Sequence, residues 1–267
     1  MPASHAGDAA QVAVIIVMAL TSAAIWWLWW RRWKAVGEIW QLAEVSNVVW
    51  NPAAVFLGLA AIGLNLWPTL QPRVAEAPAK ATLEGARDAC LFYGLLVAVL
   101  LPLLVAFDWR RLRDFGFSLV RWRRQLADGI EAAIASFLPT LAVLAATKPW
   151  RTEDEQHSLL RLLREDTRLQ TLGTVLLAAV VLAPLAEELL FRVILLGWLK
   201  TRTTRAVAIA VSAIVFSVIH GQLDGVALMP LAVLLGCLYD RRQLFLPVFV
   251  THAFFNLTNI VLALVAR

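Results

Sequence analysis

Charged residues are scarce in this chain of 267 residues, because Asp, Glu, Lys and Arg together make up only 16% of it. Soluble globular domains carry about 25% of these residues and are about 45–50% apolar, whereas this sequence is 60% hydrophobic. That excess is too large for an ordinary buried core, so a soluble enzyme is excluded. Only two cysteines are present, which excludes a disulfide scaffold. The composition is that of an integral membrane protein.

Long apolar runs account for this composition. A helix needs about 20 apolar residues to cross the roughly 30 Å of hydrocarbon in a bilayer. Eight candidate runs follow one another: Ala10–Trp30, Val48–Trp67, Cys90–Phe107, Gly129–Thr147, Leu172–Leu199, Ala206–His220, Val226–Tyr239 and Leu244–Ala266. The sixth and seventh fall short of a full crossing and could be half-helices buried among other helices. The sequence therefore predicts an all-α, polytopic membrane helix bundle of about eight transmembrane helices in the cell membrane.

Lys and Arg set the expected orientation, because cytoplasmic loops carry an excess of them. Their distribution predicts that both termini lie outside, and the net charge of +5 is assigned to inner loops rather than to nucleic-acid binding. Two connecting segments, Val36–Val45 and Ser158–Leu169, have apolar residues near helical spacing and are predicted to be amphipathic surface segments. The composition shifts near residue 150. We therefore divide the chain into an N-terminal four-helix membrane region without motifs, 1–150, and a membrane domain with the candidate site, 151–267.

Ionisable side chains are hidden inside the apolar runs of the second part, namely Glu187, Glu188, Arg192, His220 and His252. Such groups cost a few kcal/mol each within a bilayer and are functional candidates by default. Glu188 and Arg192 are four residues apart, so they share a helix face and can form an ion pair. Glu187 points about 100° away from Glu188 and can face a different neighbour.

Three more residues stand near these groups at helical spacing. Phe216 lies four residues before the first buried histidine and is expected to pack beneath it, and Asn256 lies four residues after the second. Pro184 precedes the glutamates. Because proline has no N–H, we expect it to free the carbonyl of Val180 and to bend the helix.

Two kinds of hydrolytic chemistry use such a set of groups. A buried carboxylate and an imidazole can hold and deprotonate a water molecule, while a second imidazole and an amide stabilise an oxyanion. Alternatively, Glu187, His220 and His252 match a ligand set of catalytic zinc, with water in the fourth position. Both alternatives give amide-bond hydrolysis within the membrane, and the sequence leaves both open.

Three short patterns resemble those of the CAAX protease and bacteriocin-processing family, the CPBP or ABI-domain intramembrane endopeptidases. The family pattern is E-E-x-x-x-R, then F-x-x-x-H, then H-x-x-x-N. Here the patterns run from Glu187 to Arg192, from Phe216 to His220 and from His252 to Asn256. They occur in this order on apolar runs within roughly residues 170–260, and the first 150 residues carry none of them.

The resemblance implies an intramembrane endopeptidase related to the CAAX prenyl endopeptidase, which removes the terminal tripeptide of prenylated proteins. It assigns water activation to Glu187 and His220, oxyanion stabilisation to His252 and Asn256, and support to Glu188, Arg192 and Phe216. A metal-free mechanism without a cofactor is favoured, and zinc held by Glu187, His220 and His252 is the alternative. The expected partners are the lipid bilayer and a membrane-anchored protein or peptide substrate, with no nucleic acid.

Other functions remain open at this point. The sequence has no H-E-x-x-H zinc-protease motif, no G-x-S-G motif of the rhomboid type and no G-x-G-D motif of the intramembrane aspartyl type. A non-proteolytic bacteriocin-immunity or regulatory membrane scaffold could use the same fold. Intramembrane carboxylates and histidines also occur in proton-coupled transporters, which makes transport a third and weaker alternative.

Overall fold

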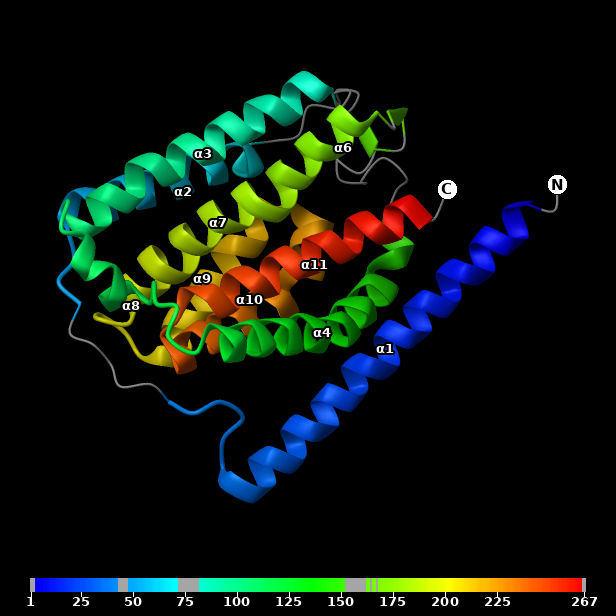
Figure 1. Cartoon of the computed structure of the whole chain (residues 1–267), viewed down its shortest axis with the longest axis horizontal. Helices are drawn as coiled ribbons and strands as arrows, with labels where there is room; N and C mark the ends of the chain where they lie inside the picture. Colours follow the sequence, from blue (N-terminus) through cyan, green and yellow to red (C-terminus); the bar gives the residue numbers. More distant parts are fainter. Residues whose placement is uncertain are drawn as a thin grey trace.

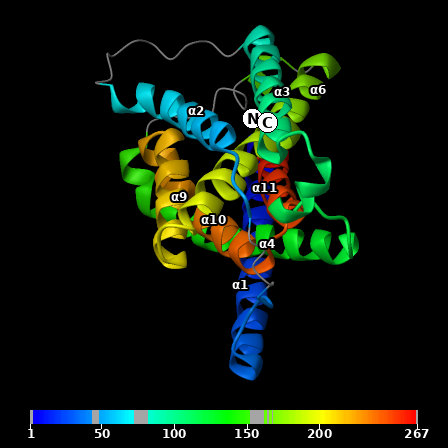
Figure 2. The same cartoon turned by 90° about the vertical axis from the view of Figure 1, so that its left-hand side faces the viewer.

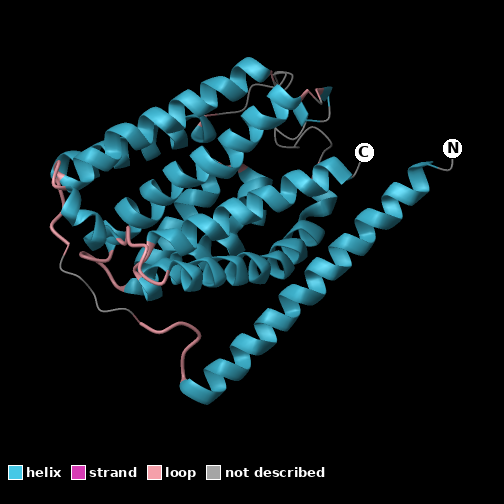
Figure 3. Ribbon diagram, viewed as in Figure 1, coloured by secondary structure: helices cyan, strands magenta, loops and turns pink. Residues whose placement is uncertain are grey.

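The computed structural model describes residues 3–42, 48–71, 82–151, 162–163, 165–166 and 168–265, with side chains from residue 12 onward. These residues form a bundle of helices without any strand (Figures 1 and 3). The long helices are α1 (Ala3–Val36), α2 (Pro52–Leu70), α3 (Leu83–Val105), α4 (Trp122–Thr147), α9 (Arg205–Ile219), α10 (Gln222–Arg242) and α11 (Phe245–Val265). Between α4 and α9, the shorter helices are α6 (Leu169–Leu176), α7 (Ala183–Glu188) and α8 (Gly197–Leu199), joined by the π-helical segments η4 (Leu177–Leu182) and η5 (Leu189–Leu196). Two 3₁₀ segments, η1 (Trp109–Phe115) and η2 (Lys148–Trp150), flank α4.

Among the described residues, seven helical spans are long and apolar enough to cross a membrane, and the span Leu169–Leu199 is one of them. Helix α9 is apolar but has only 15 residues. This arrangement confirms a multi-pass helical membrane protein of about eight spans. The seventh run, Val226–Tyr239, is longer than expected, because polar residues at both ends extend it to the 21 residues of α10. Polar residues can remain helical where a span leaves the hydrocarbon, so apolar runs underestimate helix length.

Residues 37–42 are not helical, so the described part of Val36–Val45 does not form the expected surface helix. Gly37 has a φ of +79°, a conformation that glycine adopts readily and that ends α1. Trp40 is buried, and its ring meets that of Trp29 edge-on with centroids 4.8 Å apart. An aromatic contact to α1 thus holds this segment, and residues 43–47 lie outside the described residues.

Half of the second expected surface segment, Ser158–Leu169, also lies outside the described residues. Within it, Leu162 and Leu163 are buried and pack in a small apolar cluster with Val175. These two leucines therefore face protein, whereas an interfacial helix would turn them towards lipid.

Helix α1 packs on α4, and one backbone carbonyl of α4 accepts two side-chain hydrogen bonds from α1. Pro139 lies inside α4 and has no N–H to donate to the carbonyl of Ala135, four residues earlier. Ser22 Oγ and Trp26 Nε1 of α1 both donate to this oxygen, at 2.9 and 2.8 Å, and Leu138 N donates to Ser22 Oγ at 3.0 Å. Because lipid offers no hydrogen-bond partner to a backbone group, the acceptor that the proline frees becomes a contact between two helices.

The motif-bearing helices lie in the middle of the bundle. Helices α2 and α3 cover them on one side, whereas α4 and α1 lie on the other (Figure 1). Helix α1 extends beyond the rest of the bundle at one end (Figure 2). Helix α3 packs on η4 and α7, and α4 packs on α10 and α11. One hydrophobic core includes Trp29 and Leu104 from the first 150 residues together with Phe191 and Phe255 from the rest, so both parts of the chain build the surroundings of the site.

Candidate functional site

Glu187 and Glu188 lie at the end of α7, between the two π-helical segments of one continuous rod. A π-helical turn contains an extra residue, and such turns are frequent at functional sites. Glu188 has no exposed surface and Glu187 is only 8% exposed. Both carboxylates are therefore held inside the protein, within a membrane-spanning segment.

His252 on α11 lies between the two carboxylates. Its Nδ1 is 2.7 Å from Glu188 Oε1, and its Nε2 is 3.7 Å from Glu187 Oε2. Because an ionised carboxylate can only accept a hydrogen bond, Nδ1 donates its proton to Glu188. The expected ion pair is present as well, with Arg192 Nε 3.2 Å from Glu188 Oε2. Glu188 thus orients His252 while Arg192 balances its charge.

His220 follows the last residue of α9 and faces Glu187. Its Nδ1 lies 2.7 Å from the carbonyl oxygen of Phe216, which can only accept, so Nδ1 carries the proton and Nε2 presents a lone pair when the ring is neutral. This Nε2 is 3.8 Å from Glu187 Oε2. Glu187 Oε2 is buried and has no hydrogen-bond partner within the described part of the chain, although both imidazoles lie close to it.

A tight turn between α9 and α10 places His220. Gly221 has a φ of +89°, which lets the chain reverse at this point. Gly225 then packs directly on the backbone of α9, since a Cβ atom added to it would lie 2.0 Å from the carbonyl oxygen of Ser217. The turn is therefore fixed by backbone contact on both sides of the histidine.

Phe216 is fully buried at the centre of the site. Its ring centroid lies 4.5 Å from that of His220 and 5.7 Å from that of His252, and the Arg192 guanidinium lies 4.5 Å from the Phe216 ring. The cation is thus stabilised by the face of an aromatic ring, and a single side chain keeps both imidazoles in place.

Asn256 is one turn further along α11 than His252, and its Nδ2 donates to the carbonyl oxygen of Ala179 at 2.8 Å. At the end of η4 the backbone N–H of Ala183 donates to the carbonyl oxygen of Ala178, five residues earlier instead of the four of an α-helix. The residue that would donate to Ala179 is therefore Pro184, which has no N–H. By this count the freed carbonyl is that of Ala179, one residue before the Val180 of the α-helical count, and Asn256 donates to it.

The zinc alternative can be tested against these distances. Zinc ligands lie 2.0–2.2 Å from the metal in a tetrahedral site, so two of them are about 3.3 Å apart. Glu187 Oε2 is 3.8 Å from His220 Nε2 and 3.7 Å from His252 Nε2. Within the described ranges, no group of three or more His, Cys, Asp or Glu side chains is arranged to hold a metal ion. The three residues have suitable donor atoms but do not fit zinc as they are placed.

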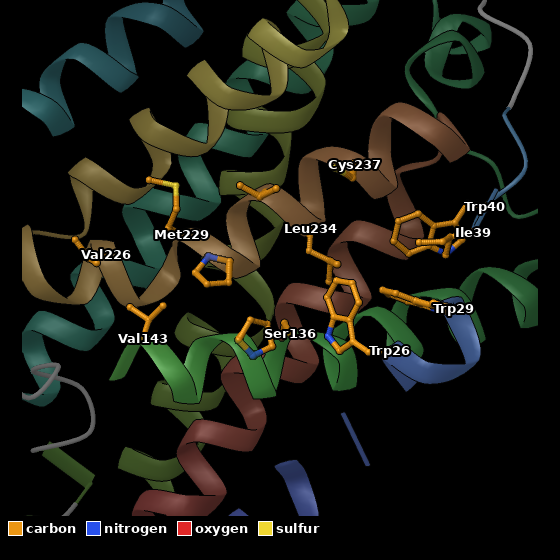
Figure 4. Close-up of a pocket in the computed structure, with 13 residues that line it drawn as sticks. Trp26, Trp29, Ile39, Trp40, Ser136, Val143, Val226, Met229, Leu234 and Cys237 are labelled. Carbon is orange, nitrogen blue, oxygen red and sulfur yellow. The ribbon is translucent and has the colours of Figure 1, made fainter. Parts of the chain in front are cut away.

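An apolar groove of about 570 Å³ opens between α1, α4 and α10. Figure 4 shows Trp26, Trp29 and Trp40 towards one end of it and Val226 and Met229 towards the other. None of the seven candidate residues is among its lining side chains, which are almost entirely carbon. The groove suits contact with hydrocarbon and is lined by no carboxylate or imidazole.

One polar side chain reaches the site from the part of the chain without motifs. Tyr93 on α3 lies close enough to Glu187 for an electrostatic interaction between the two side chains, and no sequence pattern marked it. A signal was nevertheless present, because Tyr93 is one of only two tyrosines in the chain and stands in an apolar run. A phenol in such a place needs a hydrogen-bond partner.

Comparison with known proteins gives one result on the family. Residues 170–258 match the family model described as Rce1-like, type II CAAX prenyl endopeptidase Rce1-like. All seven candidate residues fall within this segment, and the match confirms the resemblance seen in the three patterns. No curated protein and no solved structure matches the chain significantly. The family supports a CAAX-type intramembrane endopeptidase in general terms.

Proposed function

We propose that this chain, whose residues 170–258 belong to the Rce1-like family of type II CAAX prenyl endopeptidases, hydrolyses peptide bonds of membrane-associated substrates with Glu187 as its catalytic base. One observation carries the proposal. The buried Oε2 atom of Glu187 has an imidazole nitrogen on either side, 3.8 Å away in His220 and 3.7 Å away in His252.

Both distances are too long for direct hydrogen bonds. The gap between Glu187 and His220 suits one water molecule that hydrogen-bonds both of these side chains. Glu187 Oε2 accepts hydrogen bonds, and so does His220 Nε2 because Phe216 holds the proton on the other ring nitrogen. A water molecule between them donates both its hydrogens, and its oxygen lone pairs then face away from the two residues. This is the orientation that attack on a peptide carbonyl requires.

Proton transfer follows from the same geometry. Glu187 takes a proton from the water as its oxygen bonds to the carbonyl carbon, and a negative charge develops on the carbonyl oxygen. Glu187 then returns this proton to the leaving amine as the carbon–nitrogen bond breaks and the carbonyl re-forms. A base that is held in a dry, preorganised site loses little energy to reorganisation.

Stabilisation of the oxyanion is assigned to His252 and Asn256. Because His252 donates Nδ1–H to Glu188, its Nε2 can donate only when the ring carries a second proton. The two carboxylates beside the ring compensate that charge. Asn256 uses one of its two amide hydrogens on Ala179, and the second is left for the substrate.

The substrates that this site suits are proteins or peptides held at a membrane. The glutamates and His252 lie inside membrane-spanning helices and His220 directly follows the apolar α9, so the bond to be cleaved must reach them from the bilayer or its surface. A lipid-anchored C-terminus, as in CAAX proteins, satisfies this requirement. An unanchored, strongly polar polypeptide does not.

The test uses a peptide that carries a fluorophore and a quencher on either side of the bond to be cleaved, in a farnesylated and an unmodified C-terminal Cys-aliphatic-aliphatic-X form. We expect Glu187→Gln and His220→Ala each to lower kcat by about 10²–10⁴-fold, with unchanged helical content and elution in detergent. Glu84→Gln, at the exposed start of α3, is the matched control and should cleave normally. Wild-type rates in both site variants would contradict the proposal and favour the non-proteolytic scaffold.

A further inference from the structure

Residues 107–124 connect α3 to α4 and carry a strong positive charge. Six of these residues are arginine and two are aspartate, which gives the connection a net charge of +4. Both neighbouring helices are among the spans that are long and apolar enough to cross a membrane. A connection this short between two spans lies at the surface of the bilayer, at the same end of the bundle as α8 (Figure 1).

Arginines and large apolar side chains are exposed together at the start of α4. Arg121 and Arg123 are exposed, and the exposed fractions of Leu119, Val120 and Trp122 are 73%, 71% and 48%. The guanidinium of Arg123 lies 5.4 Å from the centroid of the Trp122 ring. Interleaved cations and apolar groups of this kind suit the boundary between headgroups and hydrocarbon, where indole rings settle and long cationic side chains reach outward.

The 3₁₀ segment η1 repeats this pattern. Trp109 is 52% exposed and Phe107, just before it, is 72% exposed, while Arg110 and Arg113 are exposed beside them. A guanidinium group is a planar fork of N–H donors that matches two oxygens of a phosphate at once. Both halves of the connection therefore offer phosphate-binding groups next to apolar side chains.

Buried contacts fix the backbone of this connection. The Tyr239 hydroxyl on α10 donates to the carbonyl oxygen of Phe115 at 3.2 Å. The backbone N–H of Phe245, at the start of α11, donates to the carbonyl oxygen of Gly116 at 2.9 Å. Because the backbone is already held, a ligand that binds the exposed side chains has little further order to impose.

We propose that residues 107–124 form a binding surface for anionic phospholipid, with the arginines on the headgroup phosphates and Trp109, Leu119, Val120 and Trp122 in the adjoining hydrocarbon. An anionic leaflet attracts each Lys or Arg near its surface, so this surface distinguishes anionic from zwitterionic lipid. An acidic polypeptide would match the charge alone, whereas exposed apolar side chains between two spans favour lipid. The inference does not depend on peptidase activity.

The experiment measures the melting temperature of the full chain in a neutral detergent while dioctanoylphosphatidylglycerol or dioctanoylphosphatidylcholine is added. We expect the anionic lipid to raise the melting temperature in a saturable way, and the zwitterionic lipid to raise it much less. Arg121→Gln with Arg123→Gln should raise the apparent Kd for the anionic lipid about 10-fold or more, because two charges near the surface are lost. Lysine at both positions keeps the charges and should raise it less.

The matched control is Arg87→Gln with Lys148→Gln, which removes two exposed positive charges near the other ends of α3 and α4 and should leave the apparent Kd unchanged. Equal stabilisation of the wild-type chain by both lipids overturns the inference, whether or not the variants fold. An unchanged Kd in the Arg121 and Arg123 glutamine variant, or the same rise in the control, overturns it too. Stabilisation by polyglutamate through these two arginines, without an effect of the anionic lipid, would assign the surface to an acidic protein instead.

Discussion

Asn256 donates its side-chain amide to the backbone carbonyl of Ala179 at 2.8 Å, and it fills the place of the N–H group that Pro184 lacks. The bond joins α11 to η4, one turn after His252 and about two turns before the glutamates. The same solution occurs in α4, where Pro139 frees a carbonyl that Ser22 and Trp26 of α1 satisfy. In both cases a proline creates an acceptor inside a span, and a neighbouring helix provides the donor.

This relationship predicts that the effects of Asn256 and Pro184 on stability are coupled. Asn256→Ala leaves the Ala179 carbonyl unsatisfied in apolar surroundings and should cost about 1–3 kcal/mol in unfolding free energy. In a Pro184→Ala background the helix regains its N–H, and the same change should cost less by at least about 0.5 kcal/mol. The test measures the unfolding free energy in mixed micelles of the wild type, the two single variants and the double variant. An equal cost of Asn256→Ala in both backgrounds would show that Pro184 is not the reason why the Ala179 carbonyl needs Asn256.

The turn between α9 and α10 is predicted to tolerate no side chain at Gly225. A Cβ atom there would lie 2.0 Å from the Ser217 carbonyl oxygen, so Gly225→Ala must push α9 and α10 apart and displace His220. We expect a fall of at least about 10-fold in kcat and a loss of about 1–3 kcal/mol of stability, typical of overpacking.

The control for this change is Gly63→Ala in α2, where a Cβ atom meets nothing within 4 Å. Alanine is the better helix former, so stability and kcat should stay the same or rise slightly. Wild-type turnover in Gly225→Ala would mean that the position of His220 does not depend on this backbone contact.

The ion pair beneath the site leads to a further prediction. Arg192 and Glu188 are both fully buried, so Arg192→Met leaves an uncompensated buried carboxylate and should cost about 3–5 kcal/mol. Glu188→Gln in the same chain removes that charge and should recover part of the stability. Melting temperatures in detergent measure both effects, and a double variant no more stable than the single one would contradict this account.

The helices could be predicted from the sequence because their apolar runs are long. Their ends could not, since Glu84, Arg87 and Asp88 stand before the apolar part of α3 and are still helical. Polar side chains at the end of a span reach water, so a change in composition marks the edge of the hydrocarbon and not the end of the helix. The pairing of Glu188 with Arg192 was also accessible, because four residues bring two side chains together on any helix.

Contacts between helices that are far apart along the chain could not be predicted from the sequence. The spacing of Pro184 predicted a freed carbonyl at Val180, but π-helical hydrogen bonding moves it to Ala179, and only the packing of α11 supplies Asn256 as its donor. Tyr93 went unrecognised because a phenol carries no charge near neutral pH and was not counted among the ionisable groups. Its meeting with Glu187 depends on how α3 crosses α7, which spacing along the chain cannot specify.

The last prediction concerns metal ions. If Glu187 activates water without a metal, peptide cleavage by the purified protein should be unchanged after exhaustive dialysis against EDTA and 1,10-phenanthroline, and elemental analysis should find far less than one zinc per chain. The distances of 3.7 and 3.8 Å between Glu187 Oε2 and the imidazole nitrogens favour this result, because they exceed the spacing of ligands around tetrahedral zinc. The Glu84→Gln protein, treated in parallel, controls for effects of the chelators on the detergent-solubilised fold. Stoichiometric zinc, together with activity that is lost on chelation and restored by added zinc, would show instead that Glu187, His220 and His252 move together to bind a metal ion.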